Sequence, residues 1–368
     1  MDMQNLRIPG PVPCPLEVME SMSQPLINHR GPEFKELLYS VTDRLKQVFN
    51  TTNDLYILTS SGTGALEAAL INTLSPGDKV LATVTGAFGK RFADMAEAIG
   101  CLVTRLEFEP GTVVDAKCMR AALNEDPEIK AVLTVHNETS TGTTNDLESI
   151  SAIAKGEFDK LLIVDAISSL GCIPLPVDRW GCDVVATASQ KGFLVPPGLA
   201  FISFSSTAWA AWKKSTSRRY YFDLGSAQQF LEKGQTCFTP NIPAFFALDI
   251  ALDMLLNSGL DKVYEWHQHI AELTRKNVTQ LGLSLFPLER DSSNTVTAVK
   301  IPEGIDGVEL IETLRTEHKV VLADGPGNLE GKIFRIGHMG AVTEKEIFEM
   351  FDALQLVLGE MGHQIAIK

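Results

Sequence analysis

The stretch DVVATASQKGFLVPPG (residues 183–198) places one lysine, Lys191, between an apolar run and a loop rich in glycine and proline. Similar apolar runs, rich in β-branched residues, recur between residues 54 and 205: LYILTS (55–60), KVLATV (79–84), AVLTVH (131–136), LLIVDA (161–166) and LAFISFS (199–205). Runs of this kind are typical of strands buried on both faces of a mainly parallel sheet. The pattern predicts an α/β fold with its binding crevice beyond the carboxyl ends of the strands, where Lys191 lies.

The sequence pattern changes after about residue 259. A long helical stretch is followed by short strand-like segments such as KVVLADG (319–325) and KIFRIGH (332–338), and by a last helix in which Thr343 and Glu346 have capping-box spacing. We therefore expect an extended N-terminal segment over residues 1–15, a large domain over 16–258 and a smaller α+β domain over 259–368.

Composition excludes several classes of protein. Lysine and arginine total 32 against 46 acidic residues, and a net charge of −14 repels nucleic acid and anionic membrane surfaces. The chain has no apolar run of transmembrane length, no secretory-signal layout and no peroxisomal ending, which predicts a cytoplasmic protein without a membrane partner. Its 6 cysteines include no CxxC pair, so neither a disulfide framework nor a metal site is expected.

Two loops that follow predicted strands carry polar residues suited to ligand binding. In TSSGTGALEAAL (59–70), Ser61, Gly62 and Thr63 precede a strong helix former, and the free amides of such a helix start can bind a phosphate. The run LLIVD ends on Asp165, a carboxylate that needs a cation or a strong donor when it is buried. Taken singly, these features also suit an ordinary strand-to-helix turn and a helix cap.

Lys191 lies one strand further along the chain. Desolvation can remove the charge of a lysine and make it a nucleophile that forms a Schiff base, although an exposed loop lysine is the ordinary alternative. Together, an anion site, an acid and a lysine at successive strand ends are what pyridoxal 5′-phosphate requires. The anion site would anchor the cofactor's phosphate, Asp165 would keep the ring nitrogen of the cofactor protonated, and Lys191 would form the Schiff base.

Several motifs resemble those of the class V aminotransferases, in the branch of the alanine-glyoxylate, serine-glyoxylate and serine-pyruvate enzymes. They are SSGTGALEAAL (60–70), NETSTG (137–142), VDAISSLG (164–171), ASQKGFLVPPGLAFISFS (188–205) and FRIGHMG (334–340). The resemblance runs from about residue 6 to residue 361. It implies the fold type I architecture of pyridoxal-phosphate enzymes, with a mainly parallel seven-stranded sheet, a smaller α+β C-terminal domain, and a homodimer that shares its active sites.

The resemblance also implies individual contacts. Phe88 would stack on the cofactor ring, and Gln190 would help to bind the phosphate. Ser140 or Thr141 would contact the oxygen on the cofactor ring or approach the phosphate side. The full set implied for the cofactor is Ser61, Gly62, Thr63, Phe88, Ser140, Thr141, Asp165, Ile167, Gln190, Lys191 and, from the second subunit, Asn241. Asn241 and Phe238 stand where a threonine and a tyrosine are common in the family.

Substrate contacts are expected at both ends of the chain. Arg335 would grip the carboxylate of an amino acid with two parallel hydrogen bonds. Backbone groups near Pro9 and Gly10 would close over the substrate. His29 and Arg30 also match a family motif and would shape the interface.

These expectations lead to a ping-pong transamination from alanine or serine to glyoxylate or pyruvate, with Lys191 as general base and acid. Three alternatives stay open. A lyase or desulfurase would need a loop cysteine, for which Cys237 is the nearest candidate. An aminophosphonate transaminase would share the cofactor residues but not the need for Arg335. Some relatives are labelled as soluble hydrogenase subunits, so a non-catalytic subunit is the third, although this chain lacks the cysteine clusters of hydrogenase metal centres.

Overall fold

The structure is a computed structural model that describes residues 4–364. Its centre is a seven-stranded sheet in the order β2-β10-β9-β8-β5-β3-β4. The strands are β2 (Asp54–Leu58), β3 (Lys79–Val84), β4 (Leu102–Glu107), β5 (Ala131–Val135), β8 (Leu161–Asp165), β9 (Val184–Ala188) and β10 (Ala200–Phe204). Strand β10 is antiparallel to both of its neighbours, and the other pairs are parallel. The predicted α/β fold with a mainly parallel sheet is confirmed.

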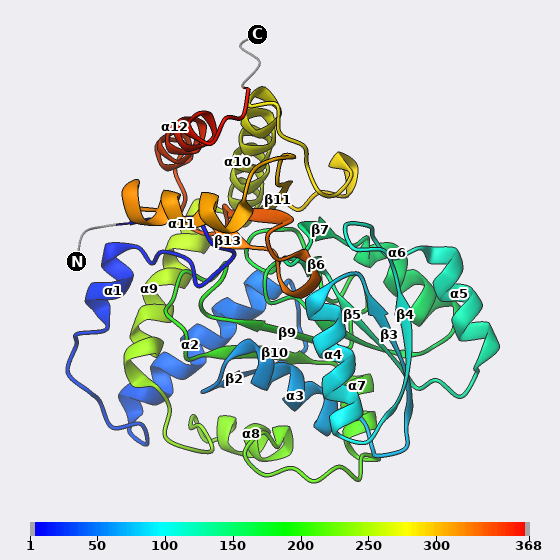
Figure 1. The fold of residues 1–368 in the computed structure, drawn as a ribbon. Coiled ribbons are helices and arrows are strands. Elements are labelled where there is room, and N and C mark those ends of the chain that lie inside the picture. The colour runs from blue at the N-terminus through cyan, green and yellow to red at the C-terminus, as the bar shows by residue number, and fades with distance from the viewer. Residues whose placement is uncertain (1–3, 365–368) are drawn as a thin grey trace.

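Helices cover both faces of this sheet (Figure 1). Alternate strand residues enter different hydrophobic cores: Val164 packs with α2 (Pro32–Phe49) and α9 (Ile242–Ser258), whereas Ile163 packs with α3 (Gly62–Thr73) and α4 (Ala87–Ala98). Because strand side chains alternate between the two faces, a strand covered on both must be apolar throughout. This explains the continuous apolar runs in the sequence.

Strand β4 is the one strand of the sheet that the apolar runs do not predict. It lies at the sheet edge, and its exposure alternates between half-buried and exposed positions. Arg105 in this strand forms ion pairs with Asp94 at 2.6 Å and Glu97 at 2.8 Å, both on α4. An edge strand that is half solvated has no need of a continuous apolar run, so its sequence signal is weak.

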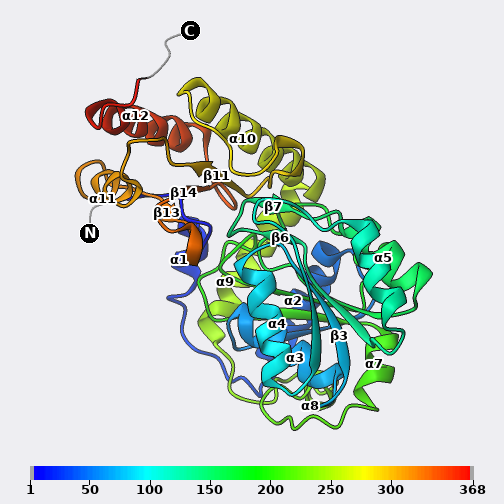
Figure 2. The same ribbon diagram turned by 45° about the vertical axis from the view of Figure 1, so that its right-hand side comes forward.

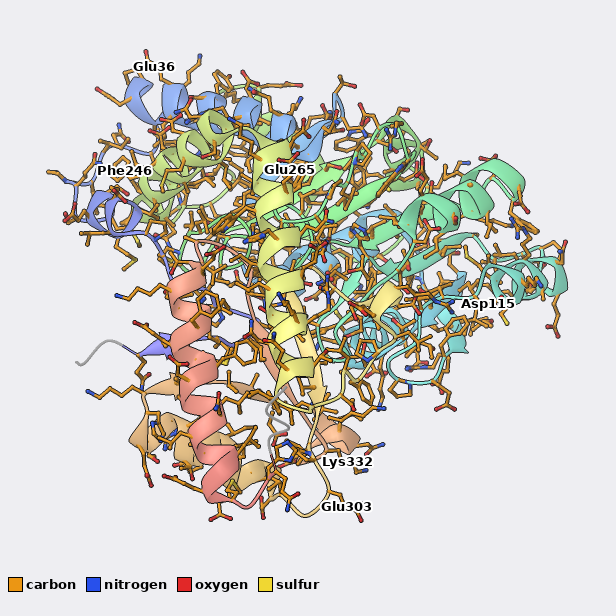
Figure 3. The ribbon with its side chains drawn as sticks, turned by 90° about the horizontal axis from the view of Figure 1, so that it is seen from above. Glu36, Asp115, Phe246, Glu265, Glu303 and Lys332 are labelled. Atoms are coloured by element: carbon orange, nitrogen blue, oxygen red, sulfur yellow. The ribbon has the colours of Figure 1, made fainter. Side chains whose placement is uncertain are left out.

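The C-terminal part of the chain has a hydrophobic core of its own. It combines the antiparallel strands β11 (Val296–Lys300), β14 (Ile333–Gly337) and β13 (Ala323–Asp324) with helices α10 (Leu260–Gln280), α11 (Gly307–Glu317) and α12 (Glu344–Glu360). The expected capping box of α12 is present between Thr343 and Glu346. Figure 2 shows α10 and α12 above the large sheet, and Figure 3 shows Glu303 and Lys332 at the outer end of this unit.

The start of the described chain packs on this C-terminal unit. Strand β1 (Asn5–Leu6) pairs in parallel with β12 (Val320–Val321), and the Gly337 N–H donates to the Arg7 carbonyl at 2.6 Å. Helices α9 and α10 meet at 86°, and the domain boundary expected near residue 258 stays a prediction. The remaining α-helices and strands are α1 (Leu16–Ser21), α5 (Ala116–Glu125), β6 (Asn137–Glu138), β7 (Thr143–Thr144), α6 (Leu147–Ser151), α7 (Ser206–Trp212) and α8 (Leu224–Leu231). A π-helix spans Ala152–Glu157, and 3-10 helices span Glu289–Asp291 and Gly327–Leu329.

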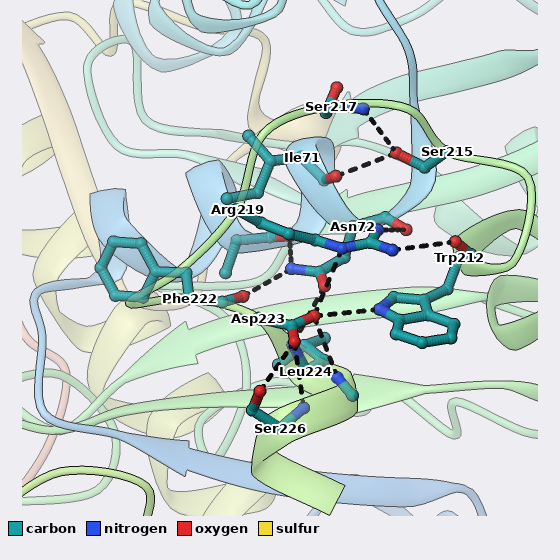
Figure 4. Close-up of polar contacts among 12 residues, drawn as sticks. Ile71, Asn72, Trp212, Ser215, Ser217, Arg219, Phe222, Asp223, Leu224 and Ser226 are labelled. Atoms are coloured by element: carbon teal, nitrogen blue, oxygen red, sulfur yellow. Dashed lines mark hydrogen bonds and ion pairs between the residues drawn. The ribbon is translucent and has the colours of Figure 1, made fainter.

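A buried amide fixes the far end of α3 to the segment that joins α7 and α8 (Figure 4). Asn72, fully buried, donates to the carbonyls of Ala68 at 2.8 Å and Phe222 at 2.6 Å, and accepts from the Leu224 N–H at 3.0 Å. Asp223 accepts from the Trp212 ring at 3.2 Å. Because the amide is buried and all its hydrogen-bonding groups have partners, it holds this end of α3 against the segment between α7 and α8.

Within residues 4–364, no single helix has both the length and the apolar composition needed to cross a membrane. Helices α9 and α10 pass that test only when they are joined across their 86° bend.

Candidate active site

A cavity of about 350 Å³ opens at the carboxyl ends of the central strands. Its wall contains residues expected from the sequence: Gly10, Ser61, Gly62, Thr63, Phe88, Asp165, Ile167, Gln190 and Lys191. They come from the ends of β2, β8 and β9, from the start of α4 and from the N-terminal segment. The crevice therefore lies where a parallel α/β sheet places its ligands.

The N-terminus of α3 forms one end of this cavity. Ser61 is the N-cap residue, but its side chain makes no capping hydrogen bond, and the first N–H groups of a helix have no acceptor within the helix. Glycine at residue 62 leaves room for Ile167, because a Cβ there would lie 2.6 Å from Cδ1 of Ile167 and 3.2 Å from Cβ of Ala188 and would displace the Ile167 side chain. The uncapped donors and the positive helix end suit an anion.

Asp165 ends β8 and is only 5% exposed. Its Oδ1 accepts from the Ile167 N–H at 2.9 Å. Burial, together with a smaller contribution from the charge of Glu138, raises the pKa of Asp165 to about 7. A buried carboxylate with one short-range donor is a strong acceptor for a protonated nitrogen that enters the cavity.

Lys191 follows β9 by three residues, and Nζ donates a hydrogen bond to the Pro9 carbonyl. Burial lowers the pKa of Lys191 to about 8, although the charge of Asp165 opposes that shift. Near neutral pH a much larger fraction of this amine is uncharged than of an exposed lysine. The side chain therefore has the chemistry of a nucleophile and of a proton acceptor.

Phe88, the second residue of α4, supplies a flat aromatic surface to the cavity. Arg91 lies one turn further along the helix, with its guanidinium 4.9 Å from the centroid of the Phe88 ring. Arg91 also lines the cavity and lowers the pKa of Asp165 through its charge. Sequence reasoning missed Arg91, although residues three apart on a helix share a face.

The motif NETSTG contributes different residues from those expected. Asn137 and Thr139 line the cavity, whereas Ser140 and Thr141 line a neighbouring surface hollow. The hydroxyl oxygen of Ser140 already accepts a hydrogen bond from the Ala87 N–H, at 2.9 Å. Side chains two positions apart on a strand point to the same face, so the short strand β6 could have identified Asn137 and Thr139 as neighbours on one face. Ser168, in VDAISS, is a further lining residue that was missed.

Arg335 lies beside the cavity rather than in its wall. Its Nε and Nη2 donate to the Asp324 carbonyl at 2.9 and 2.6 Å, and its Nη1 donates to the Thr139 carbonyl at 3.1 Å. A guanidinium has five N–H donors, so two remain for a carboxylate. Burial lowers the pKa of Arg335, but an arginine stays charged at any physiological pH.

The N-terminal segment crosses the mouth of the site. Gly10 lines the cavity with φ +117°, and a Cβ on it would lie 2.4 Å from Nζ of Lys191. The Val12 N–H donates to the Gln190 carbonyl at 3.1 Å. Pro9 takes part through the carbonyl that accepts from Lys191.

Asn241 and Phe238 do not line the cavity of their own chain. Asn241 is the N-cap of α9, where its Oδ1 accepts from the Ala244 N–H at 3.3 Å. Phe238 stacks on the ring of Tyr221 at 4.8 Å, and Tyr221 and Tyr220 are 48% and 82% exposed. His29 and Arg30 also lie outside the cavity, and Arg30 donates to the Thr236 carbonyl at 2.7 Å.

The donor set of the cavity fits pyridoxal phosphate. The cavity offers uncapped helix amides and two hydroxyls for a phosphate, a flat ring for stacking, a buried carboxylate for a ring nitrogen and a desolvated amine. The amide oxygen of Gln190 is buried and has no hydrogen-bond partner among residues 4–364. Fold and site together define an enzyme of the pyridoxal-phosphate class.

Comparison with known proteins identifies the family. The model of the aminotransferase class-V family matches residues 17–347. A protein of Synechococcus sp. named soluble hydrogenase, small subunit, is 39% identical over 98% of this chain and 94% of its own. The serine–glyoxylate aminotransferase of Arabidopsis thaliana is 32% identical over 99% of this chain and 92% of its own. The crystal structure of alanine–glyoxylate aminotransferase from Nostoc sp. is similar with a TM-score of 0.94, at 31% identity over 97% of this chain and 96% of its own.

This chain belongs to the aminotransferase class-V family. It is an aminotransferase that uses pyridoxal phosphate, and the family resemblance, the fold and the cofactor expected from the sequence are confirmed.

Proposed function

We propose that this aminotransferase moves the amino group of a small amino acid, alanine or serine, to glyoxylate or pyruvate. The observation that carries the proposal is the convergence of Lys191, Asp165 and the uncapped start of α3 in one cavity, with Arg335 beside it. Two of the proteins named above are a serine–glyoxylate and an alanine–glyoxylate aminotransferase, which supports the same substrate class here.

Pyridoxal phosphate, when bound, supplies an electron sink for the pair released at the Cα–H bond of the amino acid. Ser61, Gly62, Thr63 and Gln190 would hold its phosphate, and Phe88 would stack on its ring. Asp165 would hold a proton on the ring nitrogen through a buried ion pair. Ile167, whose N–H donates to Asp165, would keep that carboxylate in place.

Lys191 has two tasks in this proposal. Its amine would hold the cofactor, and its Nζ would accept the proton from the substrate Cα and later act as the acid that gives a proton back. A pKa near 8 suits both directions, because the uncharged and the charged forms are both well populated at neutral pH. Arg335 would hold the substrate carboxylate, and the carbonyl of Pro9 with Gly10 would close over it.

The same proposal includes a cytoplasmic homodimer. The exposed rings of Tyr220 and Tyr221 pack against Phe238, three residues before Asn241, and none of these residues lines the cavity of its own chain. Exposed aromatic side chains are typical of protein interfaces. We propose that this surface faces a second copy and that Asn241 reaches the phosphate of the partner's site. Sedimentation of the purified protein as a dimer supports this, and a monomer at working concentration removes it.

The alternatives make different demands. A desulfurase needs a reactive thiolate, but burial raises the pKa of the Cys237 thiol, and Cys237 does not line the cavity. An aminophosphonate transaminase would not use the two free donors of Arg335 on an α-carboxylate. A non-catalytic subunit would not need Lys191, Asp165 and Arg335 around one cavity.

The deciding experiment is the visible absorbance spectrum of the purified protein during sequential additions. We expect a yellow protein that bleaches with L-alanine or L-serine and recovers its colour with glyoxylate. A yellow protein that ignores every amino donor would leave the cofactor but contradict the substrate class. A colourless protein that stays so with added pyridoxal phosphate would contradict the proposed role of Lys191.

A further inference from the structure

Glu138 is a buried carboxylate at the edge of the active site that the proposed reaction does not use. It lies in β6 between Asn137 and Thr139, which line the cavity, but Glu138 itself does not line it. Glu138 is completely buried, with 0% of its surface exposed. A carboxylate is costly to bury unless each of its oxygens accepts hydrogen bonds.

Four donors converge on the Glu138 carboxylate. The backbone N–H groups of Phe88 at 3.1 Å and Gly89 at 2.9 Å donate to Oε2, and the Ser140 N–H at 3.1 Å and the Ser140 hydroxyl donate to Oε1. A carboxylate accepts on both oxygens and has about four acceptor positions. The neutral acid or an amide would instead turn a donor toward these donors.

Two of those N–H groups belong to the first turn of α4. The N-cap residue of this helix, Gly86, has no side chain to cap it, so the cap comes from β6. Glu138 satisfies the N–H groups of Phe88 and Gly89, and Ser140 accepts from the Ala87 N–H. A Cβ on Gly86 would lie 2.4 Å from Oγ of Ser140 and 2.6 Å from Cγ of Glu138, so glycine is what permits the approach.

We propose that Glu138 is a positioning residue for the cofactor, because it fixes the backbone that presents the Phe88 ring to the cavity. The inference rests on the proposed function, in which the cofactor stacks on Phe88. The negative charge of Glu138 also lies near the positive end of α4, where it stabilises the helix start. The Phe88 backbone is therefore held before any ligand enters, which restricts the positions open to its ring, and cofactor binding loses less conformational entropy.

The test uses the holoenzyme and its dissociation constant for pyridoxal phosphate, measured by equilibrium dialysis, together with the circular dichroism of the cofactor band. Glu138→Gln is expected to raise that constant about tenfold and to weaken the dichroic band, since an amide cannot accept from all four donors. Asp183→Asn is the matched control. Asp183 is a carboxylate that is 3% exposed, accepts from the Leu162 N–H at 2.9 Å and does not line the cavity.

Both variants should lower the melting temperature, but only Glu138→Gln should change the cofactor band. In a Phe88→Ala background the effect of Glu138→Gln on the dissociation constant should shrink to less than about twofold, because a residue that acts through the ring has nothing left to position. Equal effects in both backgrounds, or a Glu138→Gln variant that binds the cofactor as Asp183→Asn does, would overturn the inference.

Ser140→Ala keeps the test informative if Glu138→Gln does not fold. It removes one donor to Glu138 and the acceptor of the Ala87 N–H, so a rise of about threefold, lost in the Phe88→Ala background, is expected. An unchanged dissociation constant would count against the proposal. A wild-type protein that binds no pyridoxal phosphate would instead refute the proposed function, which keeps the two failures distinct.

Discussion

Nζ of Lys191 donates a hydrogen bond to the backbone carbonyl of Pro9, a residue 182 positions earlier in the chain. The bond joins the loop after β9 to the N-terminal segment, and that segment is itself attached to the C-terminal unit through β1 and β12. The Lys191 amine is therefore oriented by the N-terminal segment, which is not part of the large sheet.

Replacement of Lys191 tests its assigned role directly. We expect Lys191→Ala to lower kcat by at least about a thousandfold, because the variant has neither the nucleophile nor the proton acceptor. The fold should persist, as judged by far-ultraviolet circular dichroism. Lys262→Ala, at an exposed lysine outside the cavity, should leave kcat unchanged. Turnover by Lys191→Ala near the wild-type rate would contradict the assignment.

Gly337 tests the attachment of the N-terminal segment. A Cβ on Gly337 would lie 2.1 Å from the Ile8 carbonyl oxygen and 2.8 Å from the Pro9 nitrogen, so Gly337→Ala must push the segment away from β14. We expect a loss of about 1–3 kcal/mol in the free energy of unfolding. We also expect a higher KM for the amino donor.

Gly359→Ala is the control for that experiment. Gly359 lies in α12, and among residues 4–364 no atom outside its own stretch of helix lies within 4 Å of an added Cβ, so the change should be neutral or stabilise by up to about 1 kcal/mol. Chemical denaturation measures both variants. Equal stabilities for Gly337→Ala and the wild type would show that the contact is not maintained in solution.

The raised pKa of Asp165 predicts how stability depends on pH in the cofactor-free protein. Between the unfolded value of 3.8 and the folded value of about 7, the unfolded state has lost the proton that the folded state keeps. The contribution of Asp165 to the free energy of unfolding is therefore largest below the unfolded pKa of 3.8. It is lost as pH rises through the folded pKa of about 7, a loss of up to about 4 kcal/mol. The free energy of unfolding should fall from pH 5 to pH 8 relative to Asp165→Asn.

Asp115 provides a comparison of opposite sign. Hydrogen bonds from the Cys118 and Lys117 N–H groups lower its pKa at the start of α5, and Asp115 does not line the cavity. Its stabilising contribution is present above its unfolded pKa and is lost as pH falls, so Asp115→Asn should not remove the decline between pH 5 and pH 8. If Asp165→Asn shows the same decline as the wild type, Asp165 is not its source.

Arg335 should affect substrate binding more than cofactor binding. Arg335→Lys keeps the charge but cannot bond Asp324 and Thr139 and still present two parallel donors. We expect KM for the amino donor to rise at least about 30-fold, since breaking a buried charge pair costs a few kcal/mol. The dissociation constant of pyridoxal phosphate should stay within about twofold. Arg290→Ala, at an arginine that is 80% exposed, is the control, and an unchanged KM for Arg335→Lys would remove Arg335 from carboxylate binding.

The sequence predicted the strands that are buried on both faces, because continuous burial demands continuous apolar character. It did not predict β4, whose edge position removes that demand. It placed Asp165, Lys191 and the start of α3 at strand ends, and parallel strands bring such ends to one edge of a sheet. In NETSTG it pointed to Ser140 and Thr141, whereas Thr139 lines the cavity, because the direction of each side chain depends on a two-residue strand that has no clear sequence signal.

By itself, therefore, the sequence determined the class of fold, the cofactor chemistry and the loops that carry it, since these depend on local patterns of burial and charge. Only the tertiary structure decided which side chains face the cavity, that Pro9 meets Lys191, and that Glu138 caps a helix 50 positions earlier in the chain. Such contacts join residues far apart in sequence, and their geometry follows from the packing of whole elements rather than from the local pattern of any one of them.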